Sequence, residues 1–245
     1  MPTKFHIAIA GQVVGVSALH ETTQEFCRDY LTEEDADFSV AVKPEDIRIE
    51  REKSDREAII EGHEPVAYSD EYLETLSVYR KIAQGLLNYN TILFHGSVIA
   101  VDGEGYLFTA KSGTGKSTHT RLWREYFGDR AVMINDDKPL LKITDQVVTV
   151  YGTPWDGKHH LSTNTSVPLK AICILERSEA NRIAPVTAKE VFPMLCQQCY
   201  RPLSPAAMLK TLSMIDRLSH SVALYRLGCN MEQEAANIAY EGMNR

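Results

Sequence analysis

One loop constrains the fold of this chain more than any other feature, the segment Ala110-Lys111-Ser112-Gly113-Thr114-Gly115-Lys116-Ser117-Thr118. It has the A-x-x-x-x-G-K-S pattern of a phosphate-binding loop, with alanine in place of the first glycine. The apolar residues 106–109 precede the loop, and residues 118–127 after it have helical composition. In such a strand–loop–helix unit, backbone N–H groups and the helix N-terminus form a concave site for anions. The sequence therefore predicts an α/β domain that binds the phosphates of a nucleotide.

Charge and reach assign a role to each residue of this loop. Gly113 and Gly115 let the backbone wrap closely around phosphate oxygens. Lys116 reaches the terminal phosphates as a point charge, and the Ser117 hydroxyl takes one coordination position on Mg²⁺. The alternative is a glycine turn that starts a helix, with Lys116 exposed to solvent. ATP and Mg²⁺ are the expected cofactors, and the expected nucleotide-binding residues are Ser112, Gly113, Thr114, Gly115, Lys116, Ser117 and Thr118.

Two carboxylates, Asp136 and Asp137, follow the loop closely in sequence, at the end of a short predicted strand over residues 131–134. Both can face the same phosphate site. One can hold the metal while the other accepts a proton from an attacking hydroxyl. His95, on the strand before the loop, can touch the transferred phosphoryl group or orient a carboxylate. The alternatives are an Asn-Asp-Asp surface turn and a hydrogen-bonded core histidine.

Two further segments are candidates for contact with the substrate. Residues 152–158 are mostly turn-forming and include Trp155 and Lys158. A loop that follows a strand often carries the residues that contact the phosphate acceptor. Trp155 is equally suited to pin the loop as an anchor. Arg177 ends a predicted strand beside Glu176, where it can contact a phosphate or form a surface ion pair.

The N-terminal region, residues 1–68, has the pattern of a β-rich unit. Residues 4–16 and 38–49 tend to alternate between apolar and polar side chains, with Ile47 and Ile49 in the second run, which predicts half-buried strands. The charged run over residues 50–57 is typical of a solvated surface segment.

Residues 69–245 are expected to form the catalytic domain, of mixed α/β class. Apolar residues at three- and four-residue steps predict an amphipathic helix over residues 70–90. A strand pair over residues 91–101 and 106–109 surrounds a glycine turn. Thr187 and Glu190 form a capping box that starts a helix. Further strands are expected at residues 131–134, 147–151, 171–175 and 221–227, and further helices from residues 204 and 232.

Composition excludes several classes of protein. The 245 residues are 44% hydrophobic and 24% charged, close to globular averages. A net charge of −7 without a basic cluster argues against nucleic-acid binding. No apolar run suggests a membrane span or a signal peptide, so a cytoplasmic protein is expected. The five scattered cysteines do not suggest a disulfide framework, and Cys196 and Cys199 are expected to be helix residues.

The combination of His95-Gly96, Ser112–Thr118 and Asp136-Asp137 resembles the HPr kinase/phosphorylase family and the related core of phosphoenolpyruvate carboxykinases. This resemblance implies a P-loop kinase core with Asp136 as the base that deprotonates a serine hydroxyl. It also implies that Asp137 binds the metal with Ser117 and that His95 assists at the phosphoryl group. Asp156 before Gly157-Lys158 only weakly replaces the family's second acidic signature. Because the N-terminal region differs as well, the chain looks like a stand-alone paralogue.

The function expected from these features is Mg²⁺- and ATP-dependent transfer of a phosphoryl group to a hydroxyl, such as a serine of a protein, peptide or small molecule. A small-molecule kinase of another P-loop class is an alternative, although such kinases usually begin with the phosphate loop. A nucleotide-binding regulatory module without transferase activity is a third reading. The acceptor and the oligomeric state, including a homo-oligomer, are left open by the sequence.

Overall fold

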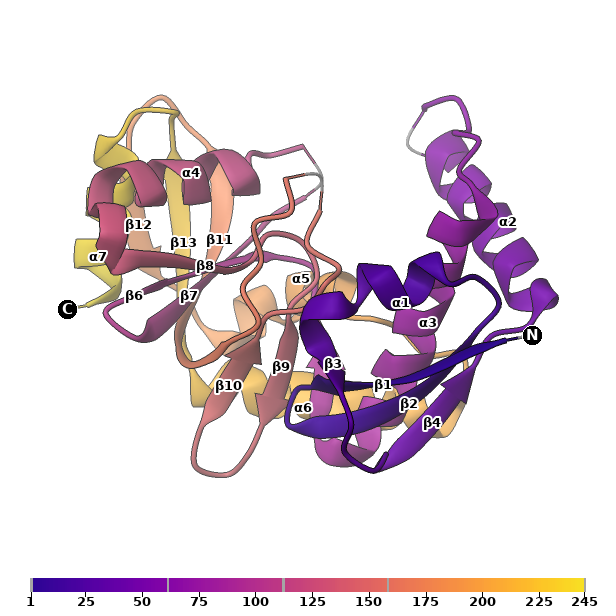
Figure 1. The fold of residues 1–245 in the computed structure, drawn as a ribbon. Helices are drawn as coiled ribbons and strands as arrows, with labels where there is room; N and C mark the ends of the chain where they lie inside the picture. Colours follow the sequence, from indigo (N-terminus) through magenta and orange to yellow (C-terminus); the bar gives the residue numbers. More distant parts are fainter. Residues whose placement is uncertain (1, 61, 112, 158, 245) are drawn as a thin grey trace. The chain divides into compact units, whose positions relative to one another are not determined.

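The structure is a computed structural model that describes residues 2–60, 62–111, 113–157 and 159–244. It divides into two compact units, Met1–Gly85 and Leu86–Arg245, each of which combines a sheet with helices (Figure 1). The mixed α/β class expected from the sequence is therefore confirmed.

The division between the units falls one helix later than the boundary expected between residues 68 and 69. Helix α3 (Asp70–Leu86) carries Arg80 and Lys81, which pair with Glu50 and Asp46 of helix α2 (Pro44–Ile60). These ion pairs connect α3 to the first unit. Ion pairs between two helices leave no periodic pattern in the sequence, so the sequence did not indicate to which unit α3 belongs.

The sheet of the first unit has the strand order β3-β1-β2-β4, formed by β1 (Thr3–Ile9), β2 (Gln12–Ala18), β3 (Leu31–Thr32) and β4 (Phe38–Ala41). Strands β1 and β2 are antiparallel, and Ala10 and Gly11 between them have φ values of 53° and 70°, as a tight two-residue hairpin turn requires. The buried face of the hairpin carries Phe5, Ile7, Val14 and Val16. The alternation over residues 4–16 therefore reflects strands with one buried face, as predicted.

The strand expected to reach Ile49 is wrong, because β4 ends at Ala41 and helix α2 begins at Pro44. Proline suits the first position of a helix, where its missing N–H would lack a partner in any case. Ion pairs one turn apart, Arg48 with Glu52 and Lys53 with Glu57, lie along the helix surface. The charged run is thus a helix surface, and Ile49 is exposed on it.

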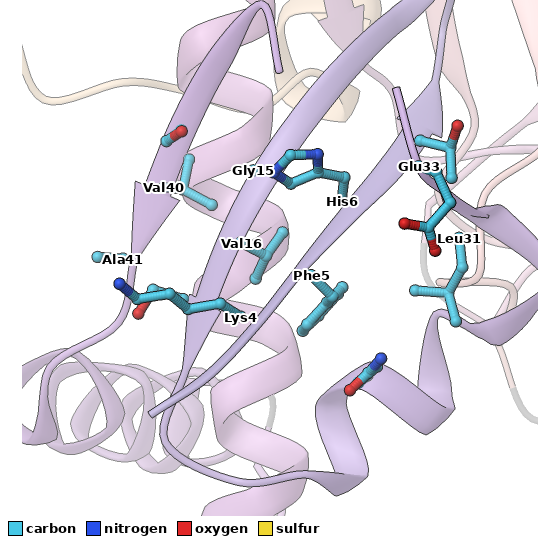
Figure 2. Close-up of a pocket in the computed structure, with 13 residues that line it drawn as sticks. Lys4, Phe5, His6, Gly15, Val16, Leu31, Glu33, Val40 and Ala41 are labelled. Atoms are coloured by element: carbon cyan, nitrogen blue, oxygen red, sulfur yellow. The ribbon is translucent and has the colours of Figure 1, made fainter. Parts of the chain in front are cut away.

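A pocket of about 640 Å³ opens on the sheet of the first unit, and Figure 2 shows the side chains that line it. Lys4 and His6 of β1, Glu33 after β3 and Ala41 of β4 are among them. All of its lining residues belong to the first unit, whereas every predicted site residue belongs to the second.

Glu74 of helix α3 is a fully buried carboxylate that connects several backbone segments of the first unit. It accepts hydrogen bonds from the backbone N–H groups of Leu19 and His20 and from the hydroxyl of Thr23 in helix α1 (Thr22–Phe26). A short 3₁₀ turn, η1 (Arg28–Tyr30), follows α1. Glu74 therefore satisfies the polar groups where the chain leaves β2 and enters α1.

We expect Glu74→Leu to lower the free energy of unfolding by about 3 kcal/mol or more, because three buried donors lose their acceptor. Urea denaturation followed by circular dichroism measures this change. Glu57→Leu on the exposed surface of α2 is the matched control and should change stability by less than about 1 kcal/mol. Equal stability of the Glu74 variant and the wild-type protein would contradict this role.

The sheet of the second unit has the central order β5-β9-β10-β11-β7-β6-β8, with β13 beside β11 and β12 beside β13. Strands β7, β11 and β13 are parallel, and β6 is antiparallel to both β7 and β8. The strand bounds are β5 (Thr91–Leu93), β6 (Ser97–Val101), β7 (Glu104–Thr109), β8 (Ala131–Asn135), β9 (Leu140–Ile143), β10 (Val148–Tyr151), β11 (Ser166–Arg177), β12 (Arg182–Pro185) and β13 (Ala223–Cys229).

Helices cover both faces of this sheet. Ile172 and Ile174 of β11 belong to the apolar cluster that includes α5 (Ala188–Gln198) and α6 (Pro205–Ser221). The alternate residues Cys173 and Leu175 pack in a second cluster with α4 (Lys116–Phe127) and α7 (Glu234–Met243). A strand buried on both faces has no polar alternation, which explains its continuous apolar sequence.

Many elements of the second unit match their predicted positions, but the strand expected over residues 91–101 is two strands, β5 beside β9 and β6 beside β7. The glycine turn is present between β6 and β7, where Asp102 and Gly103 have φ values of 53° and 84°. The capping box of Thr187 and Glu190 is formed at the start of α5. The predicted helix over residues 70–90 ends earlier, since the 3₁₀ turn η2 (Leu87–Tyr89) follows α3; another, η3 (Gly128–Arg130), follows α4.

Candidate functional site

Strand direction brings the predicted site segments to one edge of the second sheet. Because β7 and β8 both run antiparallel to β6, they are parallel to each other and end at the same edge. The phosphate loop follows β7, the acidic pair follows β8, and His95 precedes β6 at this edge. Strand β11 is parallel to β7, so Arg177 at its end arrives there too.

The described part of the loop has the backbone conformation that its glycines allow. Gly113 and Gly115 have φ values of 71° and 118°, in a region that other residues rarely occupy. Helix α4 begins at Lys116, two residues before its predicted start, and the N–H of His119 donates to the carbonyl of Gly115 at 2.9 Å. Ser112 lies outside the described residues.

Lys116 lies near both carboxylates of the acidic pair. Burial lowers the pKa of its ammonium group, while the negative charges of Asp137 and Asp136 act in the opposite direction. The lysine expected to meet the terminal phosphates therefore faces the same site as the two aspartates. Arg177 adds a second cation there, because its Nη2 donates to the carbonyl oxygen of Gly113 at 2.6 Å.

Asp136 is buried, and its carboxylate accepts a hydrogen bond from the hydroxyl of Ser97. The Ser97 Oγ donates to its Oδ1 at 2.9 Å and to its carbonyl oxygen at 3.0 Å. Burial raises the pKa of Asp136, while hydrogen bonds from Ser97 and Ser117 and the nearby charge of His159 lower it. Sequence reasoning missed Ser97, because only the pairing of β6 with β8 brings it beside Asp136.

Asp137 is held by two basic side chains. His95 Nε2 lies 3.3 Å from its Oδ1, and Lys138 Nζ lies 2.9 Å from its Oδ2. Burial raises the pKa of Asp137, but the hydrogen bond from His95 and the charge and hydrogen bond of Lys138 bring it down to about 2. Asp137 is therefore ionised at neutral pH, and His95 takes the carboxylate-orienting position that was one of its two expected uses.

The 152–157 loop lies against the acidic pair. A Cβ atom at Gly157 would be 3.3 Å from the Cβ of Asp137, so the loop backbone touches that side chain. Trp155 is buried, with 3% of its surface exposed, as an anchor of the loop would be. Asp156 is also buried and accepts hydrogen bonds from Ser162 and His160. Lys158 lies outside the described residues.

Oxygen ligands at this edge suit a hard divalent cation. Asp136, Asp137 and Ser117 contribute two carboxylates and a hydroxyl, and Mg²⁺ is usually held by one or two carboxylates together with substrate phosphates. Among the described residues, no group of three or more His, Cys, Asp or Glu side chains could hold a metal ion by itself.

His119 and Trp123 brace the start of helix α4 from inside the core. The Trp123 Nε1 donates to His119 Nε2 at 3.0 Å, and the His119 ring packs edge-on against Phe108 of β7 at 4.6 Å between centroids. Burial lowers the pKa of His119 to about 4, so its ring is neutral at physiological pH. These contacts join the strand before the loop to the helix after it.

In the described ranges, no helix has the length and apolar character needed to cross a bilayer.

Comparisons with known proteins give one family and a distant structural likeness. The family model described as "SynChlorMet cassette protein ScmC" matches residues 69–231. No curated protein matches the chain. The solved structure of the HPr(Ser) kinase/phosphatase from Coxiella burnetii is similar over 61% of this chain and 94% of that chain, with 10% sequence identity and a TM-score of 0.32. The match from the start of α3 to just beyond β13 shows that this chain belongs to the ScmC family of SynChlorMet cassette proteins.

Proposed function

We propose that this protein is a Mg²⁺- and ATP-dependent phosphotransferase that moves the terminal phosphoryl group of ATP to a hydroxyl, such as a serine of a protein, peptide or small molecule. The observation that carries the proposal is that the phosphate loop after β7 and the acidic pair after β8 arrive at one sheet edge, where Arg177 donates to the carbonyl oxygen of Gly113. A surface turn would not bring the carboxylates and the loop lysine together around a common site.

Asp136 is the proposed base. In the transfer step the acceptor oxygen attacks the γ-phosphorus, its proton passes to an Asp136 oxygen, and the bond from the γ-phosphorus to the bridging oxygen breaks to release ADP. Burial raises the pKa of Asp136, which makes it a better proton acceptor than an exposed aspartate. Ser97 keeps the carboxylate oriented through its hydrogen bond to Oδ1.

Asp137 and Ser117 are the proposed holders of the metal. When bound, Mg²⁺ supplies positive charge that offsets the charge of the phosphate oxygens. The pKa of about 2 keeps Asp137 ionised as a ligand must be, and His95 fixes its orientation. Lys116 and Arg177 are the proposed cations for the phosphates. The 152–157 loop and Lys158 are the proposed contacts for the hydroxyl substrate, and Trp155 anchors this loop.

Calorimetry with Mg-ATP, together with release or transfer of a radiolabelled γ-phosphate, tests the proposal. Water, free serine and a serine-containing peptide serve as acceptors. We expect Mg²⁺-dependent binding and measurable loss of the γ-phosphate. Binding without loss of phosphate to any acceptor would identify a regulatory module, and absence of ATP binding would reject the phosphate loop.

A further inference from the structure

We propose that Asn135 and Thr153 form a buried tie that positions the acidic pair against the 152–157 loop, and that this tie supports metal binding and phosphoryl transfer rather than ATP binding as such. The inference rests on the proposed function of the same site. Both side chains are fully buried and belong to separate segments, Asn135 to the end of β8 and Thr153 to the loop after β10.

The oxygen and the nitrogen of the Asn135 side-chain amide form hydrogen bonds with two different segments of the chain. Its Oδ1 accepts from the backbone N–H of Asp137 at 2.9 Å and of Lys138 at 2.6 Å. Its Nδ2 donates to the carbonyl oxygens of Thr153 at 3.1 Å and Trp155 at 3.4 Å. A flipped amide would place NH₂ against two N–H donors and oxygen against two carbonyls. The hydrogen-bond partners therefore fix the amide orientation.

Thr153 closes the network from the other side. Its hydroxyl accepts from Asn135 Nδ2 at 3.0 Å and lies 3.0 Å from the carbonyl oxygen of Lys138, to which it donates. The same hydroxyl lies 3.3 Å from the carbonyl oxygen of Trp155. Each side chain thus contacts both the turn of the acidic pair and the loop. Buried polar networks that are satisfied in this way rigidify the groups they join.

The start of the loop packs closely against the end of β8 and against Thr163. A Cβ atom at Gly152 would lie 2.0 Å from the carbonyl oxygen of Thr163 and 2.7 Å from that of Ile134, so only glycine fits. At the other end of the loop, Gly157 touches Asp137. The tie between these two points therefore determines how closely the loop backbone packs on the proposed metal ligand.

Asp137 is held from several directions, and the tie supplies one of them. Its N–H donates to Asn135, its carbonyl oxygen accepts from the N–H of Gly96 at 3.0 Å, and its side chain meets His95 and Lys138. Groups that orient a metal ligand typically change metal affinity or activity by about 10- to 100-fold when they are removed. The tie contacts the acidic pair after β8, whereas the loop that carries Lys116 follows β7. Loss of the tie should therefore affect the metal site more than the phosphate loop.

Thr153→Val and Thr153→Ser form a matched pair that tests the tie. Valine keeps the shape of threonine and removes the hydroxyl, whereas serine keeps the hydroxyl and removes a methyl group. We expect Thr153→Val to lower kcat for ATP hydrolysis and Mn²⁺ affinity in the presence of ATP by about 10- to 100-fold each. Metal-free ATP affinity and KM for ATP should stay unchanged, and Thr153→Ser should restore both lost properties.

Asn135→Asp separates the two halves of the tie. The carboxylate can still accept from the N–H groups of Asp137 and Lys138, but it places an oxygen against the carbonyls of Thr153 and Trp155. We expect the same pattern of losses as in Thr153→Val, with circular dichroism showing that both variants fold.

Three results would overturn the tie: unchanged kcat and Mn²⁺ affinity in folded Thr153→Val, equal losses in the serine variant, or a parallel loss of metal-free ATP affinity. The proposed function fails separately, if the wild-type protein binds ATP but releases no phosphate. In that case the Mn²⁺ affinities of the variants still decide whether the tie positions the acidic pair.

Discussion

Lys116→Ala is expected to weaken ATP binding by about 10- to 100-fold and to lower turnover by about 100-fold or more. Burial lowers the pKa of Lys116, and the negative charges of Asp137 and Asp136 oppose this shift. Without the lysine, Asp136 and Asp137 would face the phosphates with one compensating cation fewer, so binding and transfer are both lost. Calorimetry and phosphate release measure the two effects on the same protein sample.

Lys189→Ala is the matched control, because Lys189 is exposed in the first turn of α5 in the same unit. It should bind and turn over ATP like the wild-type protein. If Lys116→Ala keeps the wild-type affinity and rate, the assignment of residues 110–118 as a phosphate loop is wrong. A loss confined to turnover would instead mean that Lys116 acts mainly on the transferred group.

Short-range patterns made much of this site predictable. The loop, the helix that follows it and the acidic pair occupy one stretch of chain, and the glycine φ values match the conformations that such a loop requires. His95 arrives at the same edge because it directly precedes β6, which pairs with the strand that leads into the loop. Apolar periodicity also located α3, since this helix buries one stripe of its surface.

Contacts between distant segments could not be read in the same way. Asn135 looks like part of a surface turn in the sequence, but its amide is buried because Thr153 approaches it from another strand connection. Ser97 likewise has a role only through the pairing of β6 with β8, which places it beside Asp136. Helix α2 was missed because its few buried residues, Ile47 and Glu50, leave a weak helical period.

ScmC membership extends over the elements that build this sheet edge. The site holds its two aspartates in different environments. Asp137 has a strongly lowered pKa because of His95 and Lys138, whereas burial raises the pKa of Asp136. Two carboxylates with pKa values moved in opposite directions are suited to different tasks, one as a permanent anion and the other as a proton acceptor.

Asp136→Asn should therefore keep nucleotide binding and lower phosphoryl transfer by about 100- to 10,000-fold. Asparagine has the same shape, and its Oδ1 can still accept the hydrogen bond from Ser97, but it cannot take the acceptor's proton. Removal of a negative charge beside the phosphates should leave ATP affinity equal or slightly stronger. Calorimetry with Mg-ATP and single-turnover transfer of labelled phosphate separate the two quantities.

Asp129→Asn is the control for this substitution, because Asp129 is exposed in the 3₁₀ turn after α4 and lies outside the proposed site. Its transfer rate should equal that of the wild-type protein. An unchanged transfer rate in Asp136→Asn would reject the role of Asp136 as base. A joint loss of binding and transfer would instead give Asp136 a part in holding the nucleotide or its metal.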